Sequence, residues 1–259
     1  MTSPATYGAG RRTVLVHPDA QSLAAAVAAR LVTRLIDLQS VRAATHVALT
    51  GGTIGIALLA ELAVSPAADA VDFSTVHFWW GDERFLPAGD AERNETQARG
   101  ALLDSLVASG RLPEANIHPM PALDVARGVT TPQAAAAQYA VELGQFGLAQ
   151  AAKPGFDITL LGMGPDGHIA SLFPGFAQLN ETQRAVVGVT GSPKPPPERV
   201  TLTLPVLDAS RETWLVVAGA DKAAAVGRAL AGRELPAGRV GARERLLWLV
   251  DVAALPEAG

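Results

Sequence analysis

The sequence predicts an α/β fold, a single-domain Rossmann-like architecture in which a mainly parallel sheet is flanked by helices. Short apolar runs of strand length alternate with longer segments in which apolar residues recur every three or four positions. Hydrophobic residues make up 49% of the 259 positions and aromatic residues only 5%, so the core is aliphatic. No internal repeat or shift in composition marks a boundary. We therefore expect one domain over residues 11–259, preceded by a flexible tail at 1–10.

The strands are predicted where the apolar runs fall, at residues 13–16, 46–50, 76–80, 157–163, 186–189, 213–218 and 246–250. The first helix should begin after Asp19, whose short acidic side chain suits an N-cap. Its apolar stripe is formed by Leu23, Val27, Leu31, Leu35 and Leu38. Further helices are predicted at 54–63, 92–109, 132–150 and 221–231. The segment 114–131 contains Pro and Gly and is expected to be irregular.

Charge and composition exclude several classes of protein. The 25 acidic and 21 basic residues give a net charge of −4, which opposes a broad surface for nucleic acid or anionic membranes. The chain has no cysteine, which excludes disulfides, thiolate catalysis and cysteine metal sites. The apolar run after Arg11 and Arg12 is too short for an export signal, and no window is long enough to span a membrane. We therefore expect a cytoplasmic protein.

The most informative segment is 162–168, with the sequence GMGPDGH, directly after the apolar run 157–161. Loops that follow the strands of a parallel sheet gather at one edge, where such proteins bind ligands. The glycines permit a sharp turn, and His168 can exchange protons near neutral pH. Asp166 lies two positions before His168. This pattern predicts a catalytic turn.

Two other interpretations of this segment compete. Its glycines also match the dinucleotide-binding pattern G-x-G-x-x-G. However, Asp166 would place negative charge against the pyrophosphate, and Pro165 lacks an amide donor. The second alternative is a structural turn with a surface histidine. A polar loop after a buried strand favours a functional site over that alternative.

The turn at residues 50–53 (TGGT) is a candidate anion site. It precedes a predicted helix, so its amides and the helix dipole suit an anion such as a phosphate. It lacks the Lys of a Walker loop, so a nucleoside triphosphate is not indicated. An ordinary strand-to-helix turn is the alternative.

Two further loops carry cations. In residues 80–84 (WGDER), Arg84 offers a planar fork for phosphate or carboxylate oxygens, and Asp82 and Glu83 are expected to hold that fork. A solvated turn is the alternative there. In residues 192–199 (SPKPPPER), a stiff proline run carries two cations that it can aim at one point. A proline-rich linker or a ligand for a proline-binding domain is the alternative for that segment.

In this order, the four motifs resemble those of the 6-phosphogluconolactonase family of the pentose phosphate pathway. The matching segments are 51–53, 80–84 with Asn94 downstream, 162–168 followed by 171–174, and 192–201. Each motif alone is modest, whereas four in the same order are specific, and the resemblance spans nearly the whole chain. It implies hydrolysis of 6-phospho-D-glucono-1,5-lactone to 6-phosphogluconate by a Rossmann-like carboxylic ester hydrolase that needs no metal or cofactor.

The resemblance also implies roles for individual residues. His168 is the general acid/base, with Asp166 beside it. The phosphate and the sugar pocket would be contacted by Gly51, Gly52, Thr53, Asp82, Arg84, Lys194 and Arg199. The family's phosphate turn usually reads Ser-Gly-Gly-Ser/Thr-Thr-Pro, but here Thr53 is followed by Ile54 and Gly55. The backbone cradle is unaffected by this departure, whereas the side-chain assignments in that turn are weaker.

The nearest alternative is a glucosamine-6-phosphate deaminase of the same fold, whose turn carries a glutamate five residues after the histidine. Phe173 occupies that position here, which favours the lactonase. A non-catalytic sugar-phosphate sensor is a third alternative. The histidines form no i, i+4 pair of the zinc-binding kind, and His46 and His77 are expected to be structural. We expect a monomer that binds a sugar-phosphate lactone but no metal, nucleic acid or membrane.

Overall fold

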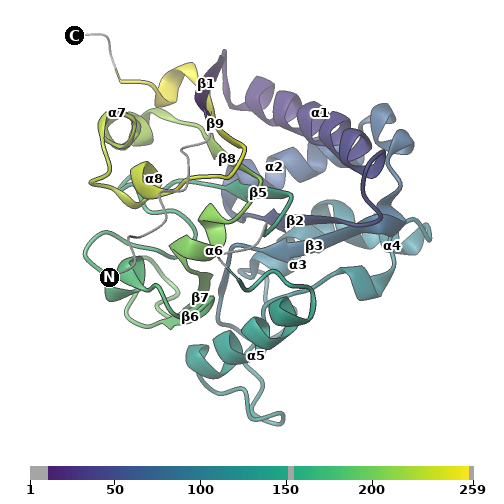
Figure 1. Cartoon of the computed structure of the whole chain (residues 1–259), viewed down its shortest axis with the longest axis vertical. Helices are drawn as coiled ribbons and strands as arrows, with labels where there is room; N and C mark the ends of the chain where they lie inside the picture. The colour runs from purple at the N-terminus through teal and green to yellow at the C-terminus, as the bar shows by residue number, and fades with distance from the viewer. Residues whose placement is uncertain (1–10, 151–154, 257–259) are drawn as a thin grey trace, which may run out of the picture.

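A computed structural model describes residues 11–150 and 155–256 (Figure 1). At its centre is a six-stranded sheet in the order β1-β9-β8-β5-β2-β3, in which every neighbouring pair is parallel. Its strands are β1 (Arg11–His17), β2 (Thr45–Leu49), β3 (Val76–Trp80), β5 (Ile158–Leu161), β8 (Glu212–Val217) and β9 (Arg245–Asp251). The prediction of an α/β fold with a mainly parallel sheet is confirmed. The predicted tail at 1–10 lies outside the described residues.

A smaller antiparallel sheet lies beside the main one. It has the order β4-β7-β6 and consists of β4 (Asp82–Arg84), β7 (Arg199–Leu202) and β6 (Val186–Val189). The run 186–189 is a strand, as predicted, but it belongs to this second sheet. Segment 82–84 is a strand rather than a turn, because Arg84 pairs with Arg199 across the β4–β7 ladder. This pairing brings two of the candidate loops together.

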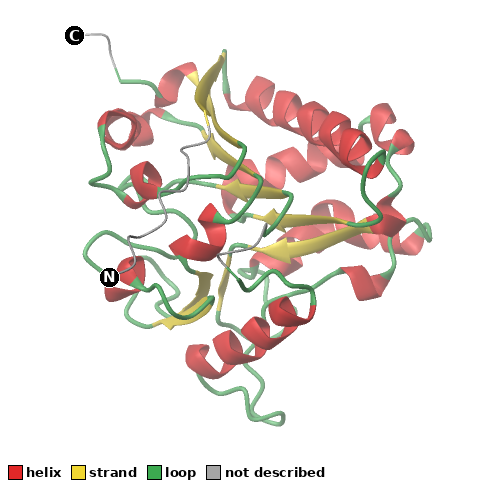
Figure 2. Cartoon of the chain, in the orientation of Figure 1, coloured by secondary structure: helices red, strands yellow, loops and turns green. Residues whose placement is uncertain are grey.

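Helices cover both faces of the main sheet (Figures 1 and 2). One face packs against α1 (Ala20–Gln39), α2 (Gly52–Ala63), α3 (Asn94–Ala98) and α4 (Asp104–Ala108). The other packs against α5 (Pro132–Gln145), α6 (Leu204–Asp208), α7 (Ala223–Ala231) and α8 (Pro236–Arg239). Successive strand residues alternate between the two cores: Trp214 and Val216 of β8 enter the first, Leu215 and Val217 the second.

The predicted helices are present, but their first or last residues differ from the prediction. Asp19 caps α1, since its Oδ1 accepts the N–H of Ser22 at 2.7 Å. The helix predicted at 92–109 is confirmed over 94–108, but it contains a π-helical turn, Arg99–Leu103, between α3 and α4. Such a bulge is not encoded by apolar spacing. The segment 114–131 is largely irregular, as predicted, and within the described residues no helix is long and apolar enough to cross a membrane.

Candidate active site

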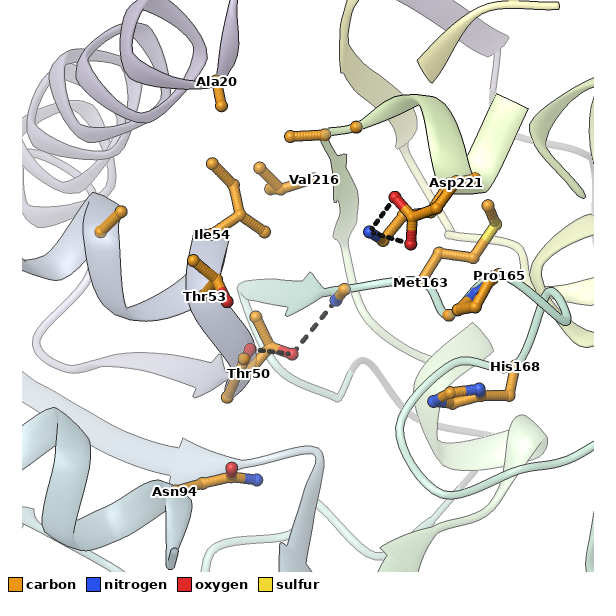
Figure 3. A pocket seen from close by; sticks show the side chains of 18 of the residues that line it. Ala20, Thr50, Thr53, Ile54, Asn94, Met163, Pro165, His168, Val216 and Asp221 are labelled. Atoms are coloured by element: carbon orange, nitrogen blue, oxygen red, sulfur yellow. Dashed lines mark hydrogen bonds and ion pairs between the residues drawn. The ribbon is translucent and has the colours of Figure 1, made fainter. Parts of the chain in front are cut away.

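A cavity of about 800 Å³ lies at the carboxyl edge of the six-stranded sheet. Of the residues predicted for the site, it is lined by Gly51, Gly52, Thr53, Asp82, Arg84, His168, Lys194 and Arg199. The four candidate loops therefore meet around one space, into which Figure 3 shows Thr53, Asn94 and His168 converging. Asp166 differs from the others, because it lies against the His168 ring rather than along the cavity wall.

The cavity lies where the order of the strands reverses. From β2 the chain continues outward to β3, and from β3 it crosses back to β5 on the other side of β2. Open α/β sheets bind ligands at such a switch point. Thr50 follows β2 and Gly162 follows β5, and the N–H of Gly162 donates to Thr50 Oγ1 at 3.1 Å. This bond joins the turn predicted to bind an anion to the turn predicted to be catalytic.

The turn at 51–53 leads into α2 without a side-chain cap on the first backbone amides of the helix. Gly51 is the N-cap of α2 and makes no side-chain cap, so the amides of the first helical turn are available to an anion. A Cβ at Gly51 would lie 1.8 Å from Asn94 Oδ1, so only glycine fits. Asn94 is 2% exposed and donates from Nδ2 to the backbone oxygen of Asp82 at 2.8 Å. Asn94 therefore packs segment 82–84 against the turn at 51–53. The sequence showed only that Asn94 follows segment 80–84, which did not predict this role.

The Asp166–His168 pair has the geometry of a general base with an orienting carboxylate. Asp166 Oδ1 and His168 Nδ1 are 2.5 Å apart, so the neutral ring carries its proton on Nδ1 and leaves Nε2 as the basic nitrogen. Among the described residues no hydrogen bond occupies Nε2, and Figure 3 shows the ring pointing into the cavity. Partial burial raises the pKa of Asp166, but the hydrogen bond to His168 and its charge outweigh burial and lower that pKa to about 2. The carboxylate can therefore stabilise an imidazolium.

Packing fixes the orientation of this imidazole. A Cβ at Gly164 would lie 2.1 Å from His168 Cε1, and the N–H of Gly164 donates to the backbone oxygen of His168 at 3.0 Å. Phe173 is fully buried, with its ring centroid 4.6 Å from that of His168. Ala170 lines the cavity with a φ of +48°, a left-handed conformation that strains a residue with a side chain. The turn is thus constrained on several sides.

The expectation that Asp82 and Glu83 hold the Arg84 guanidinium is wrong. Asp82 Oδ2 accepts from Ser171 Oγ at 2.6 Å and lies 3.9 Å from Arg199 Nη1. Glu83 instead accepts backbone N–H groups, including that of Arg84 at 2.8 Å. The difference follows from the β4–β7 ladder, in which Arg199 faces Arg84 and therefore lies diagonally across from Asp82, within reach of its carboxylate.

Arg199 braces the proline loop. It is 5% exposed and donates from Nε to the backbone oxygen of Pro196 at 3.2 Å and from Nη2 to that of Pro195 at 3.0 Å. Burial lowers the pKa of Arg199 from its ordinary value. Lys194 lines the cavity on the same loop, and its charge contributes to the low pKa of Asp166. The cation with the freer side chain is therefore Lys194.

The cavity extends beyond the four predicted loops. The additional part is lined by Ala20, Gln21, Ala24, Ile54, Ala57, Glu61, Val216, Ala218, Gly219, Asp221, Lys222 and Asp251. Lys222 Nζ lies 3.1 Å from both carboxylate oxygens of Asp221, and Figure 3 shows Asp221 above Met163 and Pro165. This part could not be predicted from the sequence, because its residues are scattered over several elements and form no contiguous motif.

The fold and the cavity define a class: an α/β protein whose switch-point site joins an anion-binding turn to an acid–imidazole pair. The chain belongs to the family described as glucosamine-6-phosphate isomerases/6-phosphogluconolactonase, whose profile matches residues 18–248. The resemblance predicted from the four motifs is thereby confirmed.

Similar proteins carry the more specific name. The chain is 52% identical over 246 residues to a 6-phosphogluconolactonase of Streptomyces coelicolor, covering 93% of this chain and 92% of that protein. It is 44% identical to a 6-phosphogluconolactonase of Mycobacterium tuberculosis, covering 91% and 94%. Among solved structures, 6-phosphogluconolactonase from Trypanosoma brucei superposes with a TM-score of 0.79 at 27% identity, covering 95% of this chain and 98% of that one.

Proposed function

We propose that this protein hydrolyses 6-phospho-D-glucono-1,5-lactone to 6-phosphogluconate in the oxidative pentose phosphate pathway. The observation that carries the proposal is the free Nε2 of His168, beside an ionised carboxylate and in one cavity with an uncapped helix N-terminus and two cations, Arg84 and Lys194. Relatives at 52% and 44% identity that bear the name 6-phosphogluconolactonase, each matched over most of its length, support it.

His168 acts first as a base and then as an acid. Its Nε2 takes a proton from a water molecule while the water oxygen bonds to the lactone carbonyl carbon and the π electrons move to the carbonyl oxygen. When the carbonyl re-forms, the bond to the ring oxygen breaks and that oxygen takes the proton from the imidazolium. Asp166 stabilises the imidazolium between the two steps. Such acid/base catalysis contributes about 10²–10⁴-fold.

Substrate binding is proposed to depend on the positive charge that lines the cavity. The amides of the 51–53 turn and the guanidinium and ammonium groups of Arg84 and Lys194 would hold the phosphate. Thr53, Asp82 and Arg199 would complete the sugar pocket, with Arg199 acting mainly through the loop that it braces. A cation near the lactone carbonyl would also stabilise the negative charge that develops on its oxygen.

The reaction uses protein side chains and water, and we propose no cofactor or metal for it. We also propose a cytoplasmic monomer that does not bind nucleic acid. The acidic balance of the chain supports the last point. Size-exclusion chromatography with light scattering tests the oligomeric state, and a dimeric mass would contradict the monomer.

The function is tested by following loss of freshly generated 6-phosphogluconolactone with and without the protein, beside ammonia release from glucosamine 6-phosphate. We expect faster loss of the lactone and no ammonia. Ammonia release would assign the chain to the deaminase branch of the family, although Phe173 leaves no carboxylate at that position. Activity in neither assay would favour a sugar-phosphate sensor.

A further inference from the structure

Two buried charged residues hold the segment that carries Arg84. Glu83 is 1% exposed and Arg93 is fully buried. Arg93 Nη2 lies 3.8 Å from Glu83 Oε2. Burying two charges is costly unless their remaining hydrogen-bonding groups are well satisfied. The proposed reaction uses neither side chain directly, so their partners show what they do.

The carboxylate of Glu83 accepts hydrogen bonds from backbone N–H groups of two elements, β4 and α3. Its Oε1 accepts from the N–H groups of Arg84 at 2.8 Å and Asn94 at 2.6 Å. Its Oε2 accepts from the N–H of Glu95 at 2.9 Å. Burial raises the pKa of Glu83 to about 7, and Arg93 and these amides oppose that rise. One carboxylate thus fastens the end of β4 to the first turn of α3.

The guanidinium of Arg93 donates hydrogen bonds to several backbone oxygens. Its Nη1 donates to the backbone oxygens of Arg84 at 3.4 Å and Leu86 at 3.3 Å, and its Nη2 donates to that of Met120 at 2.7 Å. A guanidinium presents its donors in a rigid fork, so it can fix several carbonyl groups relative to one another. Both backbone groups of Arg84 are therefore held: the N–H by Glu83 and the C=O by Arg93.

We infer that Glu83 and Arg93 are positioning residues for Arg84, which they hold ready for the phosphorylated ligand. The inference rests on the proposed function, because it assumes that the Arg84 guanidinium contacts the ligand. That guanidinium is also bound through Nη1 to the backbone oxygen of Glu92. A side chain fixed before binding loses less conformational entropy when the ligand arrives.

The test is a double-mutant cycle of Glu83→Gln and Arg84→Ala. Glu83→Gln keeps the shape of the side chain but turns one acceptor oxygen into a donor that faces an amide or Arg93. We expect kcat/KM for the lactone to fall about tenfold when Arg84 is present and to stay about unchanged when Arg84 is already Ala. The Kd of 6-phosphogluconate is measured for the same four proteins, so that the coupling between the two residues can also be determined without turnover.

The matched control is Glu212→Gln. Glu212 is also 1% exposed and multiply bonded, to Arg34 at 2.7 Å and Arg245 at 3.2 Å, but it begins β8 at the opposite edge of the sheet. We expect Glu212→Gln to lower stability without changing kcat/KM or the Kd.

Three outcomes separate the proposals. An equal loss from Glu83→Gln in both backgrounds, or a folded variant with unchanged kcat/KM and Kd, would overturn the positioning role. If Glu83→Gln does not fold, Arg93→Lys takes its place in the cycle, because it keeps the charge but loses the fork. A wild-type protein that binds 6-phosphogluconate without hydrolysing the lactone would contradict the proposed function, while the Kd cycle would still decide the positioning role.

Discussion

Two imidazole–carboxylate pairs lie in different parts of the molecule. His168 and Asp166 lie at the carboxyl edge, with Nδ1 and Oδ1 2.5 Å apart. His118 Nδ1 lies 2.7 Å from Glu142 Oε1, and the N–H of His118 donates to the backbone oxygen of Phe78 in β3, away from the cavity lining. His118 also shares a hydrogen bond of 3.0 Å between its Nε2 and His77 Nδ1. Both nitrogens of His118 are therefore occupied, whereas His168 keeps Nε2 available.

The surroundings of His118 are those of a structural residue. Its ring stacks on that of Trp79, with centroids 3.8 Å apart and planes 7° from parallel. Trp79 donates from Nε1 to His46 Nδ1 at 3.2 Å, so this neighbouring histidine is held neutral. The contacts of His46 and His77 agree with the structural role predicted for them. The two pairs therefore differ in one respect: only the His168 pair leaves a nitrogen free beside a cavity that also holds the candidate ligand-binding groups.

Among substitutions that leave His168 itself unchanged, the largest effect is expected from Gly164→Ala, which displaces the imidazole. The added Cβ would meet the His168 ring at 2.1 Å, so the ring must move. A misplacement of about 1 Å costs about 100-fold in rate, and we expect kcat to fall by that factor. Gly144→Ala in α5 is the control, because a Cβ there meets no atom within 4 Å. Near-normal kcat in Gly164→Ala would show that the position of the ring is unimportant.

Lys194→Ala should act on binding rather than on chemistry. Loss of a charge-assisted contact to phosphate costs about 1.5–3 kcal/mol, so we expect KM for the lactone to rise by about tenfold or more while kcat changes little. Steady-state kinetics with the phosphorylated lactone measure both. An unchanged KM would remove Lys194 from the phosphate site. It would also weaken the contrast with His118 and Glu142, which do not line this cavity.

His118→Asn should lower the stability of the fold and leave the activity unchanged, in contrast to substitutions in the cavity. The substitution removes the ring that stacks on Trp79 and leaves His77 and Glu142 without their partner. We expect the free energy of unfolding to fall by about 3 kcal/mol, measured by urea denaturation at pH 7. A folded variant that loses turnover would mean that this cluster, too, contributes to catalysis.

The smallest effect is a pH dependence of stability from His46. Burial lowers the pKa of His46 to about 4, with the charges of His77, His118 and Arg42 adding to it. The unfolded chain takes up this proton near pH 6.5 and the folded chain only near pH 4, so stability is fully present above pH 6.5 and is lost as the pH falls toward 4. At pH 5 the loss is at most about 2 kcal/mol.

His46→Gln isolates this contribution. The difference in unfolding free energy between variant and wild type should shrink between pH 7 and pH 5. A constant difference would mean that His46 is not held neutral in the fold. Glu83 contributes with the opposite sign, because its raised pKa removes stability as the pH rises toward 7, and it cancels in this difference.

How much could be predicted from sequence depends on the distance between partners along the chain. The turn at 162–168 could be predicted because its bonds join positions two and four residues apart. The segment 82–84 could not, because its partners are Asn94, Ser171 and Arg199, which only the second sheet brings near. The sheet and most helices follow from apolar periodicity, whereas the π-helical turn and the far part of the cavity carry no local signal.

The most direct test of the account is the effect of His168→Asn on turnover and binding. We expect kcat for 6-phosphogluconolactone to fall by about 10²–10⁴-fold, because the variant lacks the proposed base. The Kd of 6-phosphogluconate, measured by calorimetry, should stay close to that of the wild type, because His168 is not among the groups proposed to hold the phosphate. Near-normal kcat in this variant would contradict the account, since the free nitrogen of His168 would then have no part in the reaction.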